Sequence, residues 1–165
     1  ITFPARFLLV ASRNPCPCGL HGVPGAACTC TAAQLQRYRS RLSGPLLDRI
    51  DLRINIPRLS ATEVLAAPGG ESSEVVRSRV SEARKAALKR QGHSNARLAG
   101  DELRRHARLA APAQALARHA IERLGVSGRG YDRLLRVART IADLAGAPSI
   151  AEEHLAEAIA YRGAG

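Results

Sequence analysis

The stretch SGRGYDRLLRVARTIADLA, residues 127–145, decides the fold of the second half of the chain. Its apolar residues recur every three or four positions, the spacing that places side chains on one face of an α-helix. The apolar face consists of Tyr131, Leu134, Leu135, Ala138, Ile141, Ala142 and Ala145. The pattern predicts a long amphipathic helix that packs this face against other helices.

Helical patterns continue on both sides of this stretch. Upstream, the same spacing predicts helices over 74–91, 101–108 and 113–124. Downstream, Ser149 and Glu152 form a capping-box pattern that opens a last helix ending near Arg162. We therefore predict a separate helical domain over 73–165.

A linker is expected before this domain. The segment AAPGGESS (66–73) is rich in Pro, Gly and Ser, the residues typical of loops. We assign 59–72 to the linker, with its most mobile point near Pro68-Gly69-Gly70. Ser60 and Glu63 form a further capping box, which predicts one brief helix within it.

The first part of the chain, 1–58, has α/β character. The apolar run RFLLVASR (6–13) is typical of a buried strand, and LRINIP (52–57) alternates apolar and polar residues up to a proline. Between them, Thr31 suits the N-cap of a helix over 32–42, and 43–51 predicts a turn with a short helical piece. The expected fold class is thus α/β followed by all-α.

The composition of the chain indicates which kind of partner it binds and in which cellular compartment it works. The chain has 25 Lys and Arg and 14 Asp and Glu, so its net charge is +11. This charge favours binding of a polyanion such as nucleic acid or nucleotide phosphates. A basic surface that is only solvated is the alternative. The apolar run FLLVA is too short for a secretory signal or a membrane span. We expect a cytoplasmic protein that does not enter membranes.

All four cysteines lie in one loop, 15–31, as two C-x-C pairs: Cys16, Cys18, Cys28 and Cys30. Four thiolates are the ligand set of a closed, tetrahedral zinc site, which leaves no coordination position for a catalytic water. The loop has no core of its own, and bound zinc would fold it. We therefore predict a structural zinc ion.

Three other interpretations of the cysteines stay open. Disulfides would require an oxidising compartment, which nothing in the sequence indicates. The four thiols could also be unligated. In the third interpretation, His21 replaces one cysteine in the zinc site.

Three strings in order along the chain carry a family resemblance. They are FPARFLLVASRNPCPCG (3–19), YRSRLSGPLLDRIDLRI (38–54) and VSGRGYDRLLRVARTIADLAG (126–146). Together they resemble the magnesium-chelatase-like AAA+ proteins of the ComM (YifB) competence family. The resemblance implies the C-terminal strands of a AAA+ ATPase core with the zinc loop inserted, followed by a helical-bundle lid domain.

The resemblance also implies an ATPase core upstream. A Walker A loop, G-x-x-x-x-G-K-[ST], would hold the phosphates, but the motif does not occur in these 165 residues, and no Walker B run follows an apolar strand. We expect the chain alone to hydrolyse no ATP, while contributing groups that complete an ATP site in a longer protein.

Asn14 matches the family's sensor 1, a polar residue that orients the attacking water near the γ-phosphate. It follows the predicted strand, at the edge where open α/β sheets bind ligands. An amide can donate and accept hydrogen bonds without adding charge. The alternative is an asparagine that only caps the turn into Pro15.

Arg49 matches the family's arginine finger. Such a residue neutralises charge that develops on the transferred phosphoryl group of a neighbouring subunit's ATP. Asp48 and Asp51 flank it, so a local salt bridge is the alternative interpretation.

Arg129 matches the family's sensor 2, an arginine that reaches from the lid to the bound nucleotide. It lies at the expected N-terminus of the long helix, where the helix dipole favours phosphate. Arg133, one turn later, is the rival candidate for nucleotide binding. With Arg136 and Arg139 it could instead form a solvated basic face.

Two functions of different class remain. The resemblance implies a hexameric ring of identical subunits that couples hydrolysis of ATP, with magnesium, to DNA branch migration or helicase action in recombination and natural transformation. The alternative is a zinc-containing basic module that binds nucleic acid or a partner and has no role in ATP hydrolysis.

Overall fold

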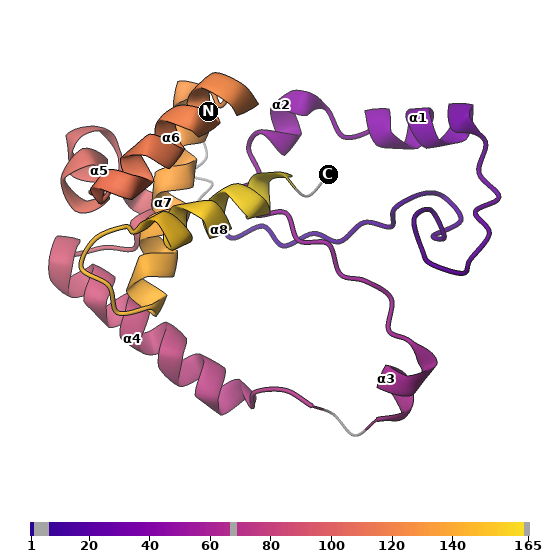
Figure 1. Ribbon diagram of the computed structural model, residues 1–165, viewed down its shortest axis with the longest axis horizontal. Helices are drawn as coiled ribbons and strands as arrows, with labels where there is room; N and C mark the ends of the chain where they lie inside the picture. Colours follow the sequence, from indigo (N-terminus) through magenta and orange to yellow (C-terminus); the bar gives the residue numbers. More distant parts are fainter. Residues whose placement is uncertain (2–6, 67–68, 164–165) are drawn as a thin grey trace. The chain divides into compact units, whose positions relative to one another are not determined.

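The computed structural model describes residues 1, 7–66 and 69–163, and in these ranges the chain is helical (Figure 1). It divides into two compact units, Ile1–Leu47 and Asp48–Gly165. The elements are α1 (Ala32–Ser40), α2 (Gly44–Leu47), α3 (Ala61–Leu65), α4 (Ser73–Gln91), the 3₁₀ helix η1 (Asn95–Arg97), α5 (Gly100–His106), α6 (Ala111–Leu124), α7 (Gly128–Leu144) and α8 (Glu152–Gly163).

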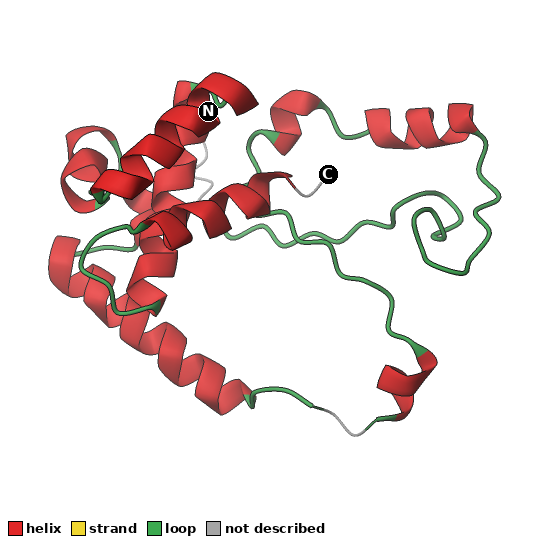
Figure 2. Ribbon diagram, viewed as in Figure 1, coloured by secondary structure: helices red, strands yellow, loops and turns green. Residues whose placement is uncertain are grey.

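The α/β part of the predicted fold class is wrong. Residues 7–13 and 52–57 form no strand, and within the described ranges the only β-type pairing is a single bridge between Leu109 and Ile150; Figure 2 accordingly shows helices and loops. A strand needs a neighbour to satisfy its backbone N–H and C=O groups, and within the described ranges no strand pairs with either segment. Phe7, Leu8 and Ile56 are consequently 75%, 88% and 84% exposed.

Other expectations about the first 72 residues have mixed outcomes. Thr31 and Ser60 each form a complete capping box, at the starts of α1 and α3, as their sequences predict. Arg6 of the predicted strand and Pro68 of the linker lie outside the described residues. The predicted domain limits at 58 and 73 stay a prediction.

The second unit is built around α7. Helices α4, α5 and α8 pack against α7, and α6 packs against α8 (Figure 1). The predicted apolar stripe supplies the centre of the core, with Leu134 1%, Ala138 0% and Ala142 0% exposed. Leu155 of α8 and Leu103 of α5 complete it from neighbouring helices. None of the described helices is long and apolar enough to cross a membrane.

Local sequence signals explain most of the helix ends. The hydroxyl groups of Ser72 and Ser127 accept hydrogen bonds from backbone N–H groups in the first turns of α4 and α7. Gly92 ends α4 in the left-handed conformation, at φ 78°. Pro112 lies in the first turn of α6, where its missing N–H costs no helical hydrogen bond.

The expected capping box of the last helix is wrong. Helix α8 begins at Glu152, and Ser149 lies outside it. The backbone of Ile150 instead accepts a hydrogen bond from Ala110 N (2.9 Å) and donates one to the carbonyl of Arg108 (3.0 Å), forming the bridge to the α5–α6 connection. The side chain of His154 then accepts the N–H of Ala151 at 3.0 Å, in place of a serine cap.

A buried carboxylate joins α4, η1 and α7. The side chain of Asp143 is 3% exposed. It accepts two hydrogen bonds from Arg90 (2.6 and 2.8 Å), one from Arg139 (2.9 Å) and one from Asn95 (2.7 Å). Burial raises the pKa of Asp143, but the hydrogen bonds from Arg90 and Asn95 and the charge of Arg139 outweigh it, so the pKa lies below its ordinary value.

We predict that Asp143→Asn lowers the free energy of unfolding by about 3–5 kcal/mol, because it leaves the buried guanidinium of Arg139 and the partly buried one of Arg90 without a carboxylate. Urea unfolding at neutral pH measures the loss. A group with a lowered pKa stabilises the fold above its ordinary pKa of 3.8, and this contribution disappears as the pH falls through the lowered value. The difference between wild type and variant should therefore shrink in acid.

Asp101→Asn is the matched control for this prediction. Asp101 pairs with Arg104 on the surface, with its side chain 92% exposed, so its replacement should leave the unfolding midpoint nearly unchanged. Equal effects of the two substitutions would contradict a structural role for the buried carboxylate.

Candidate functional site

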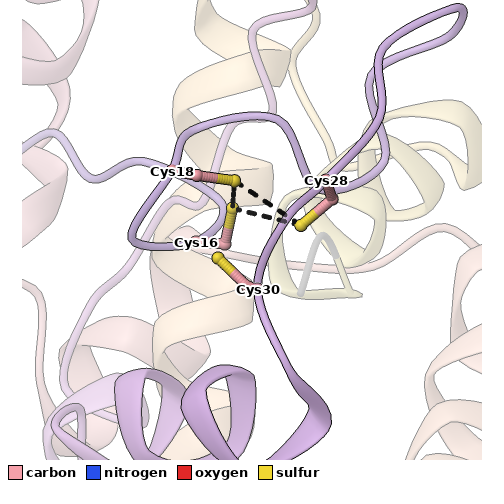
Figure 3. Close-up of side chains that lie close together, drawn as sticks. All are labelled: Cys16, Cys18, Cys28 and Cys30. Atoms are coloured by element: carbon pink, nitrogen blue, oxygen red, sulfur yellow. Dashed lines mark hydrogen bonds between the residues drawn. The ribbon is translucent and has the colours of Figure 1, made fainter.

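The four cysteines gather in a loop made of successive tight turns. Gly19 N donates to Cys16 O at 3.0 Å, Val23 N to Leu20 O and Ala26 N to Val23 O, both at 3.2 Å. Gly19 adopts φ 80°, a left-handed conformation that suits glycine. These turns fold the chain back so that the second C-x-C pair faces the first (Figure 3).

The four sulfur atoms lie within 4.8 Å of one another. Cys16 Sγ is 3.3 Å from Cys18 Sγ and 3.8 Å from Cys28 Sγ, and Cys18 Sγ is 3.6 Å from Cys28 Sγ (Figure 3). These separations far exceed the disulfide bond length of about 2.05 Å, and all four residues are free cysteines. One convergent set of four thiols could hold a metal ion.

The acidities of the thiols show why a cation fits. A backbone N–H of Leu20, together with Cys16 and the N–H of Thr29, lowers the pKa of Cys18 to about 5. The N–H of Cys18 lowers the pKa of Cys30, but burial and the neighbouring sulfur atoms outweigh it and raise that pKa to about 12. The thiol of Cys18 therefore loses its proton easily, whereas Cys30 loses its proton only against the repulsion of the neighbouring sulfur atoms. A bound cation would remove this repulsion.

His21 is not part of the sulfur cluster. Its Nε2 atom lies 3.0 Å from Nη2 of Arg39, while its backbone N–H donates to Cys16 Sγ at 3.3 Å. The alternative ligand set with His21 in place of a cysteine is therefore not the arrangement found. Its backbone instead supports one of the four sulfur ligands.

Asn14 is exposed and belongs to the same unit as the cysteine loop. The strand that was expected to present it is not formed, so its position does not rest on a sheet edge. The neighbouring Arg13 lies over the ring of Tyr38 in α1, with 5.1 Å between its guanidinium carbon and the ring centre.

Arg49 lies on an exposed segment just after α2. The two flanking aspartates pair with arginines other than Arg49. Asp48 accepts a hydrogen bond from Arg162 at 3.0 Å, and Asp51 lies 3.6 Å from Nε of Arg133. These two contacts attach the aspartates to α8 and α7, and the local salt bridge with Arg49 stays an alternative prediction.

The N-terminus of α7 carries the other two candidates. Arg129 is exposed in the first turn, and no residue of the described ranges forms an ion pair with it. Arg133 is 18% exposed, and its Nη1 atom is buried without a hydrogen-bond partner in the described part of the chain. The predicted solvated face is wrong for Arg139, which is fully buried in the core.

Arg162 was not among the candidates that the sequence motifs indicate. Its guanidinium binds Asp48 and approaches the carbonyl of Gly130 at 3.4 Å. Asp48 lies 114 positions away, so no local pattern could have revealed this contact.

Two family models match this chain. Residues 70–162 match the family described as magnesium chelatase, subunit ChlI C-terminal, and residues 1–64 match magnesium chelatase, subunit ChlI. The chain belongs to the magnesium-chelatase-like ComM/YifB family. That family is related to the AAA+ ATPases.

Curated relatives are similar over nearly the whole chain. The competence protein ComM of Haemophilus influenzae is 42% identical over 163 residues, which cover 98% of this chain and 32% of that protein. The YifB protein of Escherichia coli K12 is 44% identical over 167 residues, and a Mycobacterium tuberculosis H37Rv protein is 46% identical over 167. The chain spans about a third of the length of the curated relatives it matches.

We predict that this chain binds one cobalt(II) ion under reducing conditions, with the absorption bands of a tetrahedral thiolate complex. Cys28→Ser should weaken cobalt binding by at least about tenfold, because it removes one of four ligands. His21→Ala is the control and should leave the spectrum nearly unchanged, since its ring faces Arg39. A spectrum that is lost with His21 but kept without Cys28 would contradict this ligand set.

Proposed function

We propose that this chain supplies the sensor, arginine-finger and lid part of a AAA+ ATPase that uses ATP hydrolysis to act on DNA. One observation carries the proposal: the Arg49 segment is joined to the first turns of α7 through the Asp51–Arg133 contact. Arg49, Arg129 and Arg133 belong to the same compact unit, Asp48–Gly165, whereas Asn14 belongs to the other unit.

Each candidate residue has a role in this proposal. Arg49 neutralises charge on the transferred phosphoryl group, and Asn14 orients the attacking water. Arg129 binds the phosphates at the N-terminus of α7, where the dipole also favours an anion. Arg133, one turn later in α7 and with its side chain 18% exposed, is the second candidate for binding the phosphates.

The partners follow from the family and the charge. ATP would bind with magnesium, which accompanies the phosphates in such sites. The net charge of +11 suits DNA, and the name of the Haemophilus relative, a competence protein, suggests DNA taken up during transformation. We propose a ring of six identical subunits in the cytoplasm that moves DNA branches or separates strands.

The metal of the cysteine cluster is zinc in this proposal. Tetrahedral zinc with Zn–S bonds of about 2.3 Å requires sulfur atoms about 3.8 Å apart. The measured separations of 3.3, 3.6 and 3.8 Å are close to that value. The ion would fix the loop next to Asn14 without providing a catalytic position, because all four ligands are protein atoms.

We predict one zinc ion per chain in protein purified under reducing conditions, measured by elemental analysis. The chelated, metal-free protein should show faster amide exchange in residues 15–31, since the loop has no apolar core to hold it. A zinc content near zero with four freely titratable thiols would contradict the proposal.

We predict that Arg49→Ala in the full-length ATPase lowers kcat by at least about 10³-fold and leaves ATP affinity nearly intact, because a finger acts on charge that develops in the transition state. Arg129→Ala should weaken both binding and turnover, since a sensor also touches the ground-state phosphates. Steady-state ATPase assays and nucleotide titrations measure both. Mixing Arg49→Ala subunits with subunits that carry an inactive Walker A loop should restore some activity.

An Arg49→Ala turnover within about twofold of wild type, a change in barrier of less than ~0.4 kcal/mol, would contradict the finger assignment. The zinc-containing nucleic-acid or partner-binding module would then be the better description. In that case DNA binding would persist while ATP hydrolysis depended on none of the three candidate residues.

A further inference from the structure

Arg49 lies on a segment with no regular structure to hold it. Helix α2 ends at Leu47, and residues 52–57 form neither helix nor strand. A group that acts on a transition state must be held closely, because a displacement of about 1 Å can cost about a hundredfold in rate. Contacts with other elements must therefore position this segment.

Three contacts bracket Arg49 and lead to α7 and α8. Arg162 Nη2 binds Asp48 at 3.0 Å on one side, and Arg133 Nε lies 3.6 Å from Asp51 on the other. Beyond them, the N–H of Arg53 donates to the carbonyl of Tyr161 at 2.9 Å. The segment is thus attached to the last turn of α8 and the early turns of α7.

Arg162 is the centre of this attachment. One of its terminal nitrogens binds Asp48, and the other approaches the carbonyl of Gly130 in the first turn of α7 at 3.4 Å. The planar fork of a guanidinium can reach two acceptors at once, which the ammonium group of lysine does less well.

Gly130 leaves room for this arrangement. A Cβ atom at position 130 would lie 3.1 Å from Nη2 of Arg162, closer than ordinary van der Waals contact. Glycine within a helix is unfavourable relative to alanine, so its presence in this buried position fits a requirement for close approach.

We propose that Arg162 is a positioning residue for Arg49: it fixes the Asp48–Arg53 segment to the N-terminus of α7. This inference rests on the proposed role of Arg49 as the arginine finger. Through Arg162, the finger moves together with the helix turn that carries Arg129. The Asp48–Arg162 pair is partly exposed, at 46% and 21%, so it contributes little to the stability of the fold itself.

The test measures ATPase kinetics of Arg162→Ala, Asp48→Asn and the double variant in the full-length protein. We expect each single variant to lower kcat by about tenfold with KM for ATP within about twofold, because the finger is displaced and ATP is still bound. The double variant should be no worse than either single one, since both remove the same contact. Arg162→Lys should retain an intermediate kcat.

Hydrogen exchange gives a readout that does not depend on catalysis. Arg162→Ala and Asp48→Asn should each accelerate amide exchange in residues 48–53, including the N–H of Arg53, without lowering the thermal midpoint of the protein. Arg104→Ala is the matched control, because Arg104 pairs with Asp101 on the surface and should change neither exchange nor kcat.

The outcomes separate the two proposals. If Arg49→Ala is inactive while Arg162→Ala and Asp48→Asn keep wild-type kcat, the positioning role is wrong and the finger stands. If Arg49→Ala retains wild-type kcat, the finger fails and the positioning role fails with it. Multiplicative losses in the double variant, or equal losses in Arg104→Ala, would also overturn the inference.

Discussion

The helical unit depends on the hydrogen bonds and ion pairs that the buried carboxylate of Asp143 forms. Because it is buried, it must be matched by donors, and these come from α4 through Arg90, from η1 through Asn95 and from α7 through Arg139. Arg139 also binds the carbonyls of Ala147 (2.6 Å) and Pro148 (3.1 Å) in the loop before α8. One charge therefore sets both the packing of α4 on α7 and the start of α8.

The contacts that hold the Arg49 segment follow from this arrangement. Helix α8 runs from the loop that Arg139 fixes to Arg162, which reaches Asp48 and Gly130. The segment that carries Arg49 is thus held by the early turns of α7, which Asp143 joins to α4, and by the last turn of α8, whose preceding loop is bound by Arg139. The cysteine loop differs, since its ligands are neighbours in sequence and its order would come from a bound ion. The two sites are stabilised by different physical means.

The net charge overstates the basic surface available for DNA. Arg139 is buried in the core, and Arg90 forms an ion pair with Asp143. Arg136 donates a hydrogen bond to the carbonyl of Leu98 at 3.1 Å. Arginine has a long apolar stem and several donors, so it can serve packing and backbone satisfaction as well as phosphate binding. Arg129, in contrast, is exposed in the first turn of α7.

The sequence by itself determined the features that arise between near neighbours. The caps at Thr31 and Ser60, the stripe of α7 and the four-cysteine ligand set each depend on residues within one loop or a few helical turns. Tertiary structure alone decided the rest. The apolar segments 7–13 and 52–57 have strand-like patterns, but a strand exists only when another strand pairs with it. The partners of Asp48 and Asp51 likewise could not be predicted from the sequence. Arg162 approaches Asp48, and Arg133 approaches Asp51, only after α7 and α8 have packed.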